Sequence, residues 1–295
     1  MFFQQLLNGI FLGSVYAMVG ISFTLVLGIL HLLNFALGEV MMLGAFVSWF
    51  TVTSMGMDVF SGMAVAIVVT AILGFLMDLG VFRTLRRGKE FYLAPLVASI
   101  GLSLIIQELM VKLTGGMAVS FSEKDLAVSS FELGNVTFTS INLLVFITAV
   151  VMMLALHFFL SKTKTGVAVQ AVAESFRRAR LLGININTII LLVSAIAGAL
   201  AGISGVLIGL TYGNIAPHMA HYLVSRGFVV MLLGGFGSIY GAMIAGIIFG
   251  LIEVMAAGYL PTMYKDMWAF GLVIIILLIR PLGIFGTLPP VHRED

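Results

Sequence analysis

The residues best placed to do chemistry in this sequence form a short charged cluster beyond its midpoint. Glu174 is followed by Arg177, Arg178 and Arg180. Carboxylate and guanidinium groups form charge-assisted hydrogen bonds with a partner protein, and arginines are also attracted to anionic lipid headgroups. The chemistry available to this cluster is therefore electrostatic binding.

A second group of residues interrupts long apolar runs. A zwitterion crossing hydrocarbon needs temporary polar partners, because an unpaired charge there is costly. Broken helices often supply such partners in transporters. For Asn8 and Asn34 an interhelical hydrogen bond explains the side chain equally well, and Glu39 could instead lie at the headgroup boundary. The candidate pathway residues are Asn8, Asn34, Gly38, Glu39, Gly234 and Gly235.

Several reaction types are excluded by what the sequence lacks. It has no cysteine, and its five histidines form no HExxH pair, so we expect no metal site. The only Gly-Lys pair, Gly88-Lys89, is followed by Glu90 and does not fit a P-loop. The chain is therefore predicted not to be an enzyme, to bind no cofactor and to have no nucleic-acid partner.

Composition identifies the solvent that surrounds the chain. Hydrophobic residues make up 61% of the sequence and charged residues only 9%, against about 25% charged residues in a soluble domain. Lipid can cover such a surface, whereas water cannot. The first residues carry no Lys or Arg, so the first apolar run is predicted to be a retained span rather than a signal peptide.

Long charge-free runs predict the elements that position these residues. Runs such as 189–193 and 272–279 are apolar on every face, which fits helices and not a barrel of alternating strands. We therefore expect an all-α polytopic membrane bundle of eight or nine transmembrane helices, forming one domain over 1–295. The main runs are 1–38, 40–57, 59–77, 91–107, 133–161, 181–225, 227–252 and 267–279.

Positive charge predicts the orientation of the bundle. Basic residues gather at 83–89 and in a loop at about 161–185, which are expected to be cytoplasmic. The more acidic loop at about 114–138 is expected to be periplasmic. A true turn at 29–39 would put the N-terminus outside, and a re-entrant element there would put it inside.

The second basic loop predicts a short amphipathic helix over 167–182. Apolar residues at 168, 172, 176 and 179 share one helical face. Gly183 suits the end of this helix, and the nearby arginines suit its negative C-terminal dipole. Such a helix could lie on lipid headgroups or could dock into a groove on a cytoplasmic partner.

The same segment resembles the cytoplasmic loop of ABC importer permeases, in the form found in the branched-chain amino-acid permease family of the LivH and LivM type. The matching residues are Ala173-Glu174 and the run Ala179-Arg180-Leu181-Leu182-Gly183-Ile184-Asn185. The resemblance implies that a coupling site for an ATPase comprises Ala173, Glu174, Arg177, Arg178, Arg180 and Gly183.

The resemblance extends over nearly the whole chain, in order. It includes the opening around Asn8, the stretch from Gly28 to Glu39, the run 233–241 and the run 280–286. Chain length and the opening favour the LivH-like subunit over the longer LivM-like one. Leu37 departs from the family, which often has histidine there, and this leaves the exact substrate open.

Membership would imply the inner-membrane component of a bacterial importer for branched-chain or related hydrophobic amino acids. Its partners would be two ATP-binding subunits that hydrolyse ATP-Mg, a second LivM-like permease, a periplasmic substrate-binding protein, the amino-acid substrate and membrane lipid. Three alternatives remain at this stage: a permease for urea or short amides, an ion-gradient-driven amino-acid transporter, and a membrane-embedded enzyme.

Overall fold

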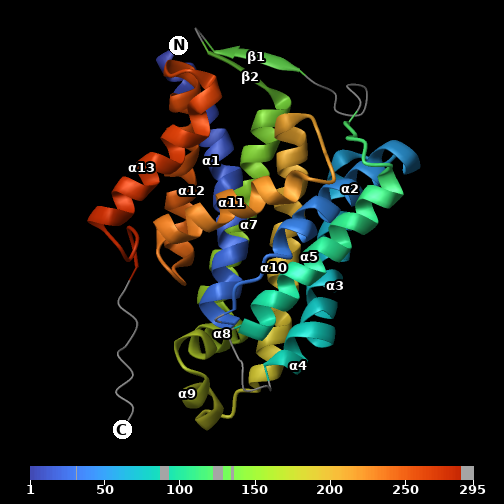
Figure 1. Cartoon of the computed structure of the whole chain (residues 1–295), viewed down its shortest axis with the longest axis vertical. Coiled ribbons are helices and arrows are strands. Elements are labelled where there is room, and N and C mark those ends of the chain that lie inside the picture. Colours follow the sequence, from blue (N-terminus) through green and yellow to red (C-terminus); the bar gives the residue numbers. More distant parts are fainter. Residues whose placement is uncertain (31, 87–92, 122–128, 134–135, 287–295) are drawn as a thin grey trace.

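The computed structural model of the chain is a bundle of helices that run between two opposite faces (Figure 1). It describes residues 1–30, 32–86, 93–121, 129–133 and 136–286. Part of the first basic cluster and most charges of the 114–138 loop, at positions 123–125, lie outside these ranges.

Seven helical stretches within the described residues are long and apolar enough to cross a membrane. This confirms the polytopic helical bundle. The expected count of eight or nine is reached only with one or both of two shorter helices, α11 (Met219–Gly234) and α13 (Lys265–Ile279). The seven stretches are α1 (Phe2–Leu25) with a π turn (Val26–Leu30), α2 (Leu37–Met55), α3 (Val59–Met77) with a π turn (Asp78–Phe82) and α4 (Arg83–Leu85), α5 (Leu93–Thr114), α7 (Ser140–Lys162), α10 (Ile186–Tyr212) and α12 (Ile239–Tyr259).

The smaller elements lie at the two ends of the bundle. An antiparallel hairpin of β1 (Ser130–Leu133) and β2 (Val136–Thr139) caps one end, which we call the hairpin face. The N-terminus lies beside it, because the Gln4 amide donates to the Thr137 carbonyl at 2.7 Å and accepts from its N–H at 2.9 Å. A 3₁₀ turn, Thr262–Tyr264, joins α12 to α13.

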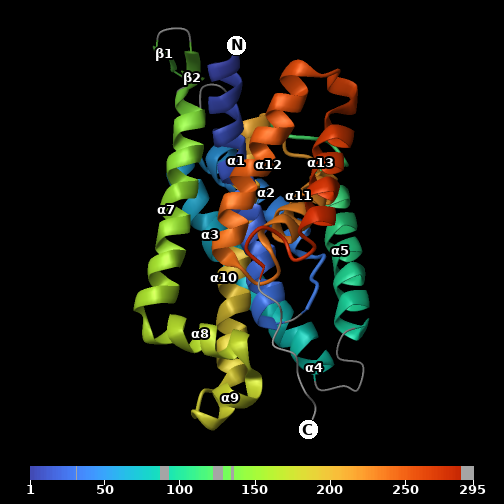
Figure 2. The ribbon, with the colours of Figure 1, turned by 90° about the vertical axis from the view of Figure 1, so that its left-hand side faces the viewer.

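Helices α4, α8 (Lys164–Glu174) and α9 (Phe176–Leu181) lie at the opposite end (Figure 2). We call this end the basic face. Its cationic residues are Arg83, Arg86, Lys162, Lys164, Arg177, Arg178 and Arg180.

Two helices, α2 and α11, begin inside the bundle. Each follows a segment without regular helix, at 32–36 and 213–218, and Figure 1 shows α11 at mid-height. The two starts are neighbours, because a Cβ added to Gly38 would lie 2.9 Å from the Ala220 carbonyl oxygen. The predicted interruption of the helix at 29–39 is thus present.

Glycines allow the closest helix contacts. A Cβ on Gly13 of α1 would lie 2.7 Å from the Ile247 Cα of α12, and one on Gly250 of α12 would meet the Gly13 backbone. The small-xxx-small pairs Gly9/Gly13 and Gly246/Gly250 therefore pack against one another. Backbone approach of this kind drives helix association in lipid, where the hydrophobic effect between helices is absent.

A buried ion pair joins α3 to the basic face. Asp78 is fully buried, and Arg86 binds both of its carboxylate oxygens, one at 2.8 Å. Arg83 is nearer to Asp78 in sequence, yet Arg86 is the residue that pairs with it. The wider turn of the π segment Asp78–Phe82 changes which later residue faces the carboxylate.

Candidate functional site

The charged cluster lies on two short helices rather than one. Ser175 is extended, with φ −166°, and its hydroxyl accepts from the Arg178 N–H at 3.3 Å to cap α9. Thr163 caps α8 in the same way, accepting from Gly166 N–H at 2.9 Å. The single helix predicted over 167–182 is therefore wrong, because a serine N-cap interrupts it.

The predicted role of Gly183 in ending the helix is confirmed. Its φ is +78°, a conformation that costs a residue with a side chain about 1–2 kcal/mol. Gly183 N–H donates to Arg180 O and Ile184 N–H to Ala179 O, both at 3.1 Å. This pair of bonds is a Schellman motif, and it turns the chain from α9 back into α10.

The inner side of α8 is fixed to the bundle. Val169 and Val172 are buried, and the Gln170 amide donates to the Leu160 carbonyl of α7 at 3.1 Å. A Cβ on Gly166 would lie 2.6 Å from the Leu160 Cα. Helix α8 also contacts α10 and the π turn Val26–Leu30, so its position is tied to the end of α1.

The outer side of this pair of helices is exposed. Glu174 and Arg178 form an ion pair at 3.0 Å, with side chains 67% and 60% exposed. Leu181 and Leu182 are 82% and 75% exposed. Arg177 and Arg180 are exposed as well. We call the exposed part of α8–α9 the tip. The six residues of the predicted coupling site lie on or directly after these two helices: Ala173 is half-buried, and Glu174, Arg177, Arg178, Arg180 and Gly183 are exposed.

The interruption before α2 holds the second group of candidates. The side-chain Oδ1 of Asn34 accepts from the Ala36 N–H at 3.0 Å, which fixes a local turn. Glu39 lies in the first turn of α2 and is 1% exposed. Ser103 of α5 donates to its Oε1 at 3.0 Å, while Oε2 has no hydrogen-bond partner among the described residues. Glu39 is therefore enclosed by protein and does not lie at an open boundary.

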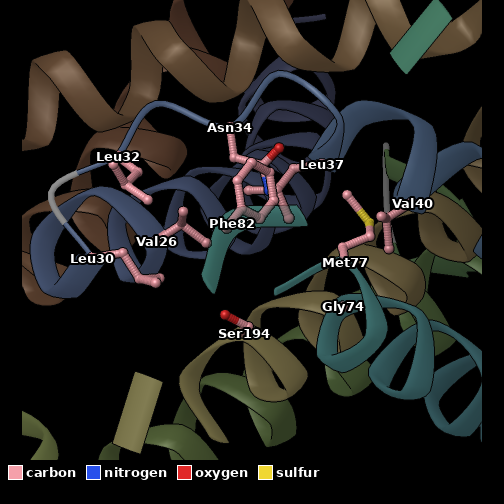
Figure 3. Close-up of a pocket in the computed structure, with 10 residues that line it drawn as sticks. All are labelled: Val26, Leu30, Leu32, Asn34, Leu37, Val40, Gly74, Met77, Phe82 and Ser194. Carbon is pink, nitrogen blue, oxygen red and sulfur yellow. The ribbon is translucent and has the colours of Figure 1, made fainter. Parts of the chain in front are cut away.

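A small cavity lies between this interruption, α3 and α10 (Figure 3). Asn34, Leu32 and Leu37 face it from one side and Met77 and Ser194 from the others. Its volume is about 20 Å³, which holds about one water molecule. Leu37, the departure from the family pattern, thus borders a space too small for an amino acid.

The remaining pathway candidates lie elsewhere. Asn8 accepts from the Gln4 amide at 3.3 Å, near the hairpin face. Gly234 and Gly235 end α11, and Gly234 O accepts from the Phe285 N–H at 3.2 Å. The structure therefore brings together Asn34, Gly38 and Glu39. Asn8, Gly234 and Gly235 lie apart from them, at other contacts between packed segments.

A row of polar residues on α5 was not predicted from the sequence. Ser99 accepts from the Phe35 N–H at 3.2 Å, Ser103 donates to Glu39, and the Gln107 amide lies 2.9 Å from His218 Nδ1 and 3.3 Å from His221 Nε2. We call Ser99, Ser103 and Gln107 the α5 polar edge. Their four-residue spacing in an apolar helix is the signal that could have revealed it.

A buried network around Arg226 was also missed. The hydroxyls of Tyr16, Tyr212 and Tyr222 lie 2.6–3.1 Å apart, and Tyr222 donates to Glu253 at 3.3 Å. Arg226 lies 2.6 Å from Asp266 and 3.6 Å from Glu253. These groups come from α1, α10, α11, α12 and α13, so no local sequence pattern indicates their association.

Comparison with known proteins gives the family of the chain. The family described as "Branched-chain amino acid transport system / permease component" matches residues 5–279. The branched-chain amino acid permease protein BraD of Pseudomonas aeruginosa is 36% identical, over 99% of this chain and 98% of BraD. LivH of Escherichia coli K12 is 37% identical, over 99% of this chain and 97% of LivH.

A more distant relative carries a different name. The autoinducer 2 import system permease protein LsrC of Yersinia pestis is 26% identical, over 62% of this chain and 53% of LsrC. No solved structure matches the chain significantly. The permease relatives and the seven candidate spans together indicate a multi-pass protein of the bacterial inner membrane. On the match over residues 5–279 and the full-length similarity to BraD and LivH, the chain belongs to the family of branched-chain amino acid transport permease components.

Proposed function

We propose that this chain is a membrane-spanning subunit of a bacterial ABC importer for branched-chain or related hydrophobic amino acids. A periplasmic binding protein delivers the substrate, and ATP-Mg is hydrolysed on partner subunits. The observation that carries the proposal is the tip of α8–α9, which exposes Leu181 and Leu182 among arginines while its inner side is fixed to the bundle. Two exposed leucines at the end of a rigid pair of helices suit a groove on a partner.

The contacts of α8 offer a route from this tip to the membrane interior. Helix α8 packs against the π turn Val26–Leu30, which leads directly into the interruption that carries Asn34 and Glu39. Short π segments often mark functional sites in helices. A movement of the tip would therefore shift the start of α2, and the small cavity beside Leu37 gives that shift room.

The distribution of charge supports an orientation. Arg83, Arg86 and the α8–α9 arginines gather at the basic face, which would be cytoplasmic under the positive-inside rule. The hairpin face, and the N-terminus beside Gln4, would then be periplasmic. Two ATP-binding subunits would contact the basic face, a second LivM-like permease would pair with this one in the membrane, and the binding protein would dock at the hairpin face.

The coupling role of the tip is tested by changing Glu174→Ala and Arg178→Ala together. In the complex reconstituted in liposomes, we expect ATP hydrolysis to continue while leucine uptake falls. The control is Glu108→Ala on the exposed side of α5, which removes a carboxylate away from the tip. Normal uptake in the Glu174/Arg178 variant would refute the coupling role.

The proposed assembly is tested by isolation in mild detergent. A tag on this chain should recover two ATP-binding subunits and a second, different permease in constant ratio. Recovery of a stable homodimer without these subunits would contradict the assembly.

A further inference from the structure

Helix α5 packs on the bundle through the buried apolar residues Ile106 and Met110 and through its polar edge. Ser99, Ser103 and Gln107 each bind a group on the opposing elements. The opposite side of α5 is exposed: Leu104 is 57% and Ile105 67% exposed, and the charged Glu108 and Lys112 are exposed as well. Ser103 and Gln107 are half-buried, and His218 and His221, which Gln107 contacts, are exposed. Polar groups inside a membrane protein either pair across helices or face a water-filled route.

Glu39 is the acidic group behind this edge. Its carboxylate is buried, and within the described part of the chain only Oε1 is bound, by Ser103. An ionised carboxylate has about four acceptor positions, so Glu39 keeps capacity for a further donor. Burial disfavours the negative charge of Glu39 while it lacks a cationic partner, and its place in the first turn of α2 partly offsets this. The donor that best matches a buried carboxylate with a free oxygen is a cation such as an ammonium group.

A site for an anionic group lies one helical turn further along α5. Gln107 binds His218 and His221 there, and both histidines are exposed at the start of α11. The first N–H groups of a helix lack intrahelical acceptors, and the dipole there attracts anions. Residues one turn apart have Cβ atoms about 5–6 Å apart, which suits the adjacent ammonium and carboxylate of one α-amino acid.

An apolar surface adjoins these polar groups. Val224 and Phe228 follow His221 on the same face of α11 and are half-buried. The Phe228 ring lies 5.1 Å from the ring of Phe35, and Val224 packs against Gly38. A hydrophobic side chain extending from the zwitterion would contact this surface.

We propose that the α5 polar edge, the start of α2 and the start of α11 form the wall of the translocation route and a transient site for a zwitterionic hydrophobic amino acid. Glu39 binds its ammonium group, while Gln107 and the start of α11 with His218 bind its carboxylate. This inference rests on the proposed importer function and adds the groups that contact the substrate.

Water along the edge is tested by single cysteines introduced into this cysteine-free chain, with the label measured on this chain after it is separated from its partner subunits. A charged, water-soluble thiol reagent reacts with thiolates in water and not with thiols in lipid. In the assembled transporter, Gln107→Cys should react at least tenfold faster than Leu104→Cys and Ile105→Cys. Equal reaction rates at the three positions would overturn the water-lined wall.

The role of Glu39 is tested by Glu39→Gln, which keeps the size and removes the charge. In liposomes containing the whole complex and the binding protein, leucine uptake should fall at least tenfold while ATP hydrolysis stays within about twofold. The control is Glu108→Gln on the exposed side of α5. Unchanged uptake, or a parallel loss of uptake and hydrolysis, would overturn the assignment, since a structural role would affect both.

The importer function and the substrate site can be refuted separately. If the unmodified complex takes up no leucine with ATP, the importer function itself is wrong. If it does so and Glu39→Gln transports equally well, only the substrate site is wrong. If the Glu39→Gln variant assembles poorly, Gln107→Cys labelling still shows whether water reaches the α5 polar edge.

Discussion

The buried guanidinium of Arg226 allows the sharpest prediction about stability. Its side chain is 4% exposed, lies 2.6 Å from Asp266 and 3.6 Å from Glu253, and stacks 3.5 Å from the centre of the Tyr222 ring. Arg226→Met keeps much of the volume but leaves Glu253, among the residues that the structure describes, with Tyr222 and with Lys265 at 3.9 Å. Breaking a buried pair by removing one partner costs about 3–5 kcal/mol.

A second substitution separates two causes of the lost stability: the unpaired charge of Glu253 and the lost packing around Arg226. Glu253→Gln in the Arg226→Met background removes the unpaired carboxylate, so the double variant should recover part of the loss. The two sites should show a coupling energy of about 1–3 kcal/mol. Arg178→Met at the exposed tip, where both partners of the ion pair face solvent, should cost at most about 1 kcal/mol.

The assay is unfolding of the purified chain in one fixed detergent, followed by a probe of helix content as denaturant rises. The expected order of stability is Arg178→Met first, the double variant second and Arg226→Met last. The reasoning is refuted if Arg226→Met is as stable as Arg178→Met, or if adding Glu253→Gln lowers stability further.

Three other substitutions test packing and charge. Gly250→Ala should lower stability by about 1–3 kcal/mol because its Cβ meets the Gly13 backbone, whereas Gly271→Ala, which has open space, should change it by less than about 0.5 kcal/mol in the same assay. Gly166→Ala should displace α8 from α7 and lower leucine uptake per ATP hydrolysed, measured in liposomes; an unchanged ratio would contradict the mechanical role of α8. Asp78→Asn should destabilise the chain by several kcal/mol, about 3–5 by analogy with other broken buried pairs, and equal denaturation midpoints for it and the unmodified chain would contradict this.

Features determined by neighbouring residues could be predicted from the sequence. Apolar runs gave the helices and the membrane location, since only a helix satisfies its backbone within one run. The apolar face at 168, 172, 176 and 179 is turned toward the bundle, with Val172 and Ala179 buried. Gly183 ends α9 because a left-handed residue is needed there.

Features that depend on distant residues could not be predicted. Ser175 was expected within a helix, but capping of the next helix outweighed its moderate helix propensity. The partner of Asp78 depended on a π turn that no local pattern indicates. Glu253 and Arg226 lie 3.6 Å apart on two different helices, α12 and α11, and the contact of Ser103 with Glu39 joins residues 64 positions apart.

The glycine contact between α1 and α12 has a consequence for biogenesis. When the chain is inserted from its N-terminus, α1 enters the bilayer long before α12. Helix α1 packs against α12 through Gly9 and Gly13. Until then its small-residue face must be covered by lipid, by the insertion machinery or by an interim neighbour. The bundle is therefore completed late. A chain halted before residue 239 would leave the small-residue face of α1 uncovered, and quality-control proteases could recognise it.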